Sequence, residues 1–117
     1  MRISNNFNSP NFGIRIDKNF KRSANNFYFN KDLSIQQVKL TKKIEQLESI
    51  GDENSLIKSI RLKENGELVN ILCFINRKFD NKQALIMEKS RDFNDILKFF
   101  IDLTPEKIEA YEDLLAK

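Results

Sequence analysis

The sequence predicts an α+β fold, and three patterns carry that prediction. Apolar residues recur at helical spacing after residue 34, a hairpin turn stands at Asn65-Gly66, and two amphipathic stretches close the chain. A succession of helix, antiparallel strands and helices is typical of folds in which helices pack on an antiparallel sheet. With 117 residues, 40% apolar and 32% charged, the chain has the size and composition of one soluble globular domain, and we expect residues 1–117 to form a single domain.

The first 31 residues are expected to contain an arm and a hairpin. Residues 1–11 are rich in Asn and Ser, which predicts an irregular arm. In the basic aromatic segment, residues 12–31, Phe12, Ile14 and Ile16 alternate with small or polar residues, and 27–29 is an aromatic run. Both patterns favour short strands. We therefore expect an N-terminal β-hairpin whose connecting loop is polar and basic.

Residues 32–117 predict a body with the element order α-β-β-β-α-α. The first helix is expected over about 34–50, because Ser34 and Gln37 fit a capping box and Gly51 is a natural stop. Its apolar stripe consists of Leu40, Ile44 and Leu47.

The turn Asn65-Gly66 predicts the strand register, because both of its central residues need positive φ. Folding the chain there pairs Leu62 with Val69, Ile60 with Ile71, Lys58 with Cys73, and Leu56 with Ile75. That face is apolar apart from its one lysine. A third strand, at 83–89, would complete a three-stranded antiparallel meander.

Two helices are expected to follow the meander. Asp92 is placed to cap the first, and Thr104-Pro105-Glu106 is a helix start with three agreeing features. We expect these two helices to pack on one face of the sheet. The other face, with Ile57, Leu72 and Phe74 among polar residues, would be covered in part by the helix at 34–50.

Charge is distributed unevenly along the chain. Residues 1–43 hold nine basic and two acidic side chains, which gives them a net charge of +7. Residues 44–117 hold eleven basic and fifteen acidic side chains, which gives them a net charge of −4. Such asymmetry favours a surface that meets an oppositely charged partner. The candidate binding residues are Arg15, Lys18, Phe20, Lys21, Arg22 and Tyr28.

Three interpretations of this basic aromatic segment remain open. Arg and aromatic side chains are frequent anchors of protein interfaces, which favours docking on an acidic protein surface. Cations that track phosphates and rings that stack on bases would equally suit single-stranded nucleic acid. The third interpretation is structural: the Phe side chains form core, and the cations solvate the outer side.

Catalytic chemistry has little support in the sequence. The chain has no histidine, which excludes histidine-based triads and dyads, and we find no phosphate-binding glycine loop, nucleophile elbow or zinc spacing. The single cysteine, Cys73, is expected to be a core residue, and the acidic residues of the last helices to be a solvated face. We expect no enzyme activity, no cofactor and no metal.

These patterns together predict a small non-enzymatic binding protein that occupies a macromolecular partner, a protein in preference to a nucleic acid. An inhibitor, an immunity-like protein or an accessory protein of a bacterium or phage would suit this description. The lone cysteine and the lack of a long apolar run or secretory signal favour the cytoplasm without membrane contact. Homo-oligomerisation is left open.

Overall fold

The computed structural model describes residues 13–77 and 84–116, which form four helices and a four-stranded mixed sheet. The fold class is therefore α+β, as predicted. The predicted arm at 1–11 lies outside the described residues. In chain order the elements are β1 (Arg15–Ile16), α1 (Lys18–Asn30), α2 (Ser34–Glu48), β2 (Ser55–Glu64), β3 (Glu67–Asn76), β4 (Ala84–Ser90), α3 (Phe93–Ile101) and α4 (Pro105–Leu115).

The sheet has the strand order β1-β2-β3-β4. Strands β2, β3 and β4 are antiparallel and correspond to the predicted meander, while β1 adds a short parallel strand beside Leu56 and Ile57. The predicted hairpin register is confirmed at all four pairs. Asn65 and Gly66 adopt φ of 53° and 81°, as the two-residue turn requires.

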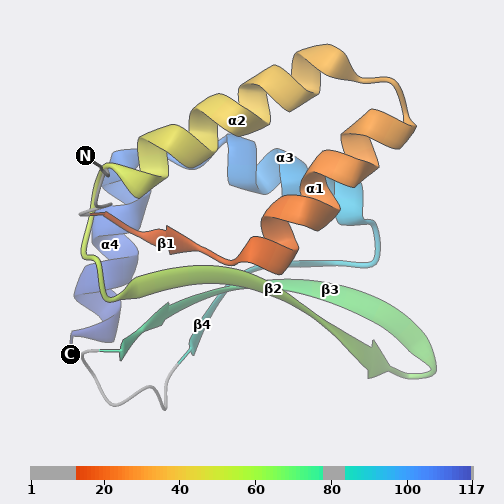
Figure 1. Cartoon of the computed structure of the whole chain (residues 1–117). Coiled ribbons are helices and arrows are strands. Elements are labelled where there is room, and N and C mark those ends of the chain that lie inside the picture. Colours follow the sequence, from red (N-terminus) through yellow and green to blue (C-terminus); the bar gives the residue numbers. More distant parts are fainter. Residues whose placement is uncertain (1–12, 78–83, 117) are drawn as a thin grey trace.

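All four helices lie on one side of the sheet, so the described chain forms two layers (Figure 1). The core between the layers combines Ile57, Leu72 and Phe74 of the sheet with side chains of every helix. Its helical members include Phe20, Ala24, Tyr28, Leu40, Leu47, Ile96, Leu97, Phe100, Ile108 and Leu115.

The prediction that helices would cover both faces of the sheet was wrong. The helices share the face of Phe74, while the apolar face predicted from the turn carries a small separate cluster of Val69, Ile71 and Cys73 with neighbours from its own strands. These three side chains are 4–6% exposed because β3 is central: β2 flanks all three, and β4 also flanks Ile71 and Cys73. A count of apolar residues per face therefore did not identify the face that the helices bury.

The predicted N-terminal hairpin was also wrong: its first strand is present in part as β1, but residues 18–30 form helix α1. The Asp17 carboxylate accepts a hydrogen bond from the Phe20 backbone N–H at 3.1 Å and caps the helix. Phe20, Ala24 and Tyr28, each four residues from the next, then share its buried side. Burial of this stripe prevails over the local strand preference of the aromatic run at 27–29.

Helix boundaries elsewhere follow the sequence closely. Asp92 and Thr104 cap α3 and α4 through their side chains, as predicted. For α2 the predicted capping box is wrong, since Leu33 is the N-cap and no side chain caps the helix. Phe99, which stands off the apolar stripe of α3, is half-buried against the core with the Lys107 ammonium 5.6 Å from its ring centre.

A polar network joins α4 to the start of the sheet. Glu112 accepts hydrogen bonds from the Asp52 backbone N–H at 2.7 Å and from the Ser55 hydroxyl at 3.2 Å. The Asn76 amide in turn donates to the Ser55 oxygen at 3.0 Å. Ser55 and Asn76 are buried, and the contacts satisfy polar groups that burial would otherwise penalise.

Candidate partner-binding surface

The structure separates the six candidate residues into two groups. Arg15, Lys18 and Arg22 are exposed, and the last two share one side of α1 because they are four residues apart. Lys21 is half-buried and forms an ion pair with Glu48 at 3.0 Å. Phe20 and Tyr28 lie in the core and are 2% and 1% exposed.

The buried aromatic residues of α1 are engaged inside the molecule. The Phe20 ring meets those of Phe93 and Phe100 edge to face, with ring centres 6.3 and 5.0 Å apart. Tyr28 is 1% exposed, and burial raises the pKa of its phenol above the ordinary 10.0. The core interpretation therefore holds for these rings, while the cations of the segment remain at the surface.

Four large apolar side chains are exposed where α1 turns into α2, and we call them the tip patch: Phe29, Leu33, Ile35 and Val38. Phe29 and Ile35 are each 71% exposed. The described chain has eight large apolar side chains with such exposure, so half of them fall within ten consecutive residues. Grouped exposure of this kind marks interaction sites more often than scattered apolar residues do.

The turn that presents the tip patch is held by the backbone. Asp32 takes a φ of 56°, and the Leu33 N–H donates to the Tyr28 carbonyl at 2.9 Å. This geometry ends α1 at Asn30 and starts α2 at Ser34 without drawing the apolar side chains inward. On α2, Ile35 and Val38 face away from the stripe that contains Leu40 and Leu47. Figure 1 shows the two helices as a hairpin whose turn projects from the helical layer.

Cations flank the tip patch. Lys31, Lys39 and Lys42 are exposed, and Asp32 is the single acidic residue between positions 18 and 43. The Lys31 ammonium lies 5.1 Å from the Phe27 ring centre. Across 13–77 and 84–116, no carboxylate lies within ion-pair distance of Lys18, Arg22, Lys39 or Lys42. The α1–α2 hairpin thus joins apolar exposure with positive charge that no carboxylate of residues 13–77 and 84–116 neutralises.

Sequence reasoning missed the tip patch, although a signal was present. Ile35 and Val38 stand on the side of the helical pattern opposite to Leu40, Ile44 and Leu47, where polar residues are expected. Phe99 likewise stands off the apolar stripe of α3, yet the structure shows it half-buried against the core. An apolar residue off the stripe is therefore informative only once the neighbouring elements are known.

Other groups with reactive side chains give no second candidate. Cys73 is buried, and burial raises the pKa of its thiol while the charge of Lys58 opposes the shift. The described residues contain no group of three or more His, Cys, Asp or Glu side chains that could hold a metal ion. No helix in that part of the chain is long and apolar enough to cross a bilayer.

Comparison with protein families, with curated proteins and with solved structures gave no match. The surface itself is therefore the basis for a functional proposal.

Proposed function

We propose that this protein is a small non-enzymatic binding protein that acts by occupying a protein partner through the tip patch and its surrounding cations. The observation that carries the proposal is the coincidence, on one helical hairpin, of four exposed apolar side chains with exposed lysines that have no ion-pair partner among the described residues. An inhibitor, an immunity-like protein or an accessory protein of a bacterium or phage, working in the cytoplasm, would act in this way.

The physical form of the surface supports a protein partner. Burial of exposed Phe and Ile side chains in a partner's groove supplies affinity, because apolar area removed from water contributes about 25 cal/mol per Å². Unpaired cations at the rim increase the rate of association with an acidic partner and suppress binding to basic ones. The expected partner surface is therefore an apolar groove bordered by Asp and Glu.

The test is recovery of a partner from native lysate after nuclease treatment, with matched variants. Val38 and Leu114 are both 53% exposed on helices, and only Val38 belongs to the tip patch. We expect Val38→Glu to weaken the complex at least tenfold, or about 1.4 kcal/mol, and Leu114→Glu to leave it unchanged. Circular dichroism checks that both variants fold.

Equal loss of the partner in both variants, or in neither, would contradict the choice of surface. Charge reversal at Lys18 and Arg22 should act differently from Val38→Glu. It should slow association and make binding less sensitive to salt, while dissociation changes little.

A second candidate, nucleic-acid binding, is favoured by one observation. The exposed side of α1 carries Lys18, Arg22 and four asparagines, and the helix has no acidic residue. Cations contact phosphates and amides hydrogen-bond to base edges. Stacking of bases on aromatic rings would contribute little to this binding, because Phe20 and Tyr28 are buried.

Labelled oligonucleotides distinguish the two candidates. A nucleic-acid binder would bind them with an affinity that falls steeply with salt, would lose binding in Arg22→Glu and would tolerate Val38→Glu. Nuclease treatment of the lysate would then remove the co-purifying material.

A further inference from the structure

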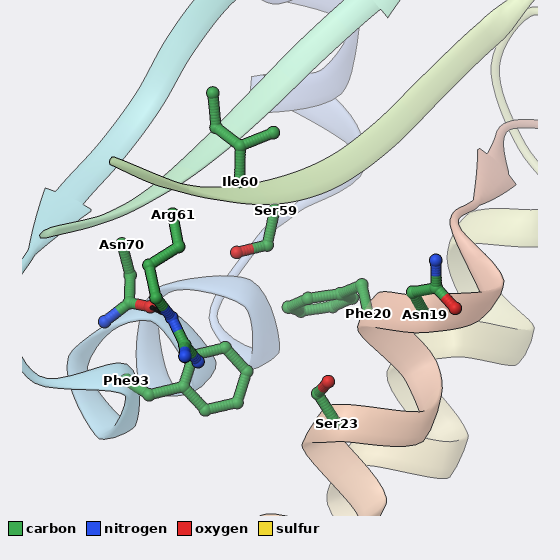
Figure 2. Close-up of a pocket in the computed structure, with 8 residues that line it drawn as sticks. All are labelled: Asn19, Phe20, Ser23, Ser59, Ile60, Arg61, Asn70 and Phe93. Carbon is green, nitrogen blue, oxygen red and sulfur yellow. Dashed lines mark hydrogen bonds between the residues drawn. The ribbon is translucent and has the colours of Figure 1, made fainter. Parts of the chain in front are cut away.

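A pocket of about 200 Å³ opens between α1, the sheet and the start of α3 (Figure 2). It lies on the sheet side of α1, away from the tip patch, and is independent of the proposed function. Its lining consists of Asn19, Phe20, Ser23, Ser59, Ile60, Arg61, Asn70 and Phe93.

The pocket exists because of a small residue on β2. Ile57, Ser59 and Arg61 alternate along the face that the helices cover, and Ile57 is fully buried. At the next helix-facing position Ser59 leaves space that an Ile or Leu would fill. In Figure 2 the Ser59 and Arg61 side chains lie on the side of β2 that faces the helices, with Arg61 extending toward Phe93, and Ile60 points to the opposite side of the strand.

The polar lining carries positive charge without an acid. Arg61 is the single charged residue of the pocket, and the described chain places no carboxylate within ion-pair distance of it. Its Nε donates to the Asn70 side-chain oxygen at 3.4 Å, and Asn70 is itself 7% exposed and donates to the Arg91 carbonyl at 3.3 Å. Asn70 therefore holds one edge of the guanidinium and leaves the other N–H groups for a ligand.

Two hydroxyls add to this donor set. The hydroxyls of Ser23 and Ser59 form no hydrogen bond with other protein groups in residues 13–77 and 84–116. Ser59 is half-buried next to the fully buried position of Ile57, and its hydroxyl has no partner within the described residues; such departures from pattern are typical of binding sites. Hydroxyl and guanidinium donors together complement the oxygens of a carboxylate or phosphate.

The pocket also has an aromatic wall. Phe20 and Phe93 stand edge to face with ring centres 6.3 Å apart, and Phe20 is held from behind by Phe100. This wall is fixed before any ligand arrives, and it favours a planar or apolar group next to the anion.

We propose that this pocket binds a small organic anion in which a carboxylate or phosphate adjoins a ring. The anionic oxygens meet Arg61 and the two serine hydroxyls, and the ring packs on the half-buried Phe93, which the buried Phe20 supports. The volume of about 200 Å³ suits one ring and one anionic group.

Titration of the full chain with benzoate and phenyl phosphate, followed by amide chemical shifts in NMR, tests the proposal. We expect saturable shifts at Ser59, Arg61 and Phe93, with a dissociation constant of roughly 1–10 mM for ligands of this size. Acetate and inorganic phosphate test the anion without the ring, and benzamide tests the ring without the charge. Each should bind at least tenfold more weakly.

Variants separate the pocket from general charge. Arg61→Gln should reduce benzoate affinity at least tenfold, and Ser59→Ile should abolish the shifts by filling the space. Lys63→Gln, which removes an exposed cation two residues away on the same strand, is the control and should bind as the wild type does. Binding that survives Arg61→Gln, or equal shifts with benzamide, would overturn the proposal, as would no saturable shift at all.

Discussion

Two polar regions on the same face of β2 differ in whether the protein itself supplies hydrogen-bond partners for their side chains. Ser55 and Ser59 are four residues apart and point to the same side of the sheet. Around Ser55, α4 supplies Glu112 and β3 supplies Asn76, so donors and acceptors meet inside the protein. Around Ser59 the neighbours are Arg61 and Asn70, and no described element brings a carboxylate.

The difference shows that the role of a serine on a helix-covered strand face cannot be predicted from the residue type alone. The same residue type contributes to stability where a helix delivers its partner, and to ligand binding where the space in front of it stays open. Because α4 packs over the Ser55 end and not over the pocket, the position of one helix assigns both roles.

Glu112→Ala should have the largest effect on stability, because it removes the acceptor at the Ser55 end of β2. This change leaves the Asp52 N–H and the Ser55 hydroxyl without the acceptor that they share, and should lower the free energy of unfolding by about 2–3 kcal/mol. Urea denaturation measures the loss. Asp113→Ala, at the exposed neighbouring position, should stay within about 0.5 kcal/mol of wild type.

A smaller and sharper test applies one substitution to both serines. Ser55→Ala should cost about 1–2 kcal/mol of unfolding free energy, since it removes hydrogen bonds to Glu112 and from Asn76. Ser59→Ala should change the free energy of unfolding by less than about 0.5 kcal/mol, because no internal hydrogen bond is lost. Equal losses of unfolding free energy in Ser55→Ala and Ser59→Ala would contradict the view that only Ser55 has hydrogen-bond partners inside the protein.

The smallest expected effect on stability is its pH dependence, which the two tyrosines cause. Burial raises the pKa of Tyr28 on α1 and of Tyr111 on α4 above 10.0, and the charge of Glu88 adds to the increase at Tyr111. The folded protein therefore keeps phenolic protons that the unfolded chain has already lost. This contribution to stability is complete below pH 10.0 and is lost as the pH rises through the folded-state values.

Absorbance of tyrosinate during an alkaline titration checks this prediction, because the chain has two tyrosines and no tryptophan. Glu88→Gln should lower the pKa of Tyr111 and leave that of Tyr28 unchanged. A phenol that ionises at or below its ordinary pKa would show that its ring is not buried.

Local chemistry in the sequence was sufficient for several elements. Asn65-Gly66 predicted the hairpin and its register, and Asp92 and Thr104 predicted two helix starts, because each feature depends on residues close together in the chain. Helix α1 was missed although Asp17, Phe20, Ala24 and Tyr28 contain its cap and its stripe. Aromatic strand preference was given more weight than spacing.

The candidate surface was predictable only in part. The basic character of residues 15–22 was visible, but which of their side chains face water was not, since that depends on the sheet and α3 beneath α1. Neither the tip patch nor the pocket follows from local pattern, because each is formed where two or three elements meet.

The pairing of β1 with β2 has a consequence for how the chain assembles during synthesis. The β2–β3 hairpin closes over two residues, at small entropic cost, whereas Arg15 must find Leu56 across both helices of the crossover. On the ribosome, α1 and α2 are made before the surface that they cover exists. The apolar stripes of α1 and α2 cannot pack on the sheet until the β2–β3 hairpin has been synthesised and has folded. We therefore expect the first helices to be synthesised to be among the last to reach their native positions.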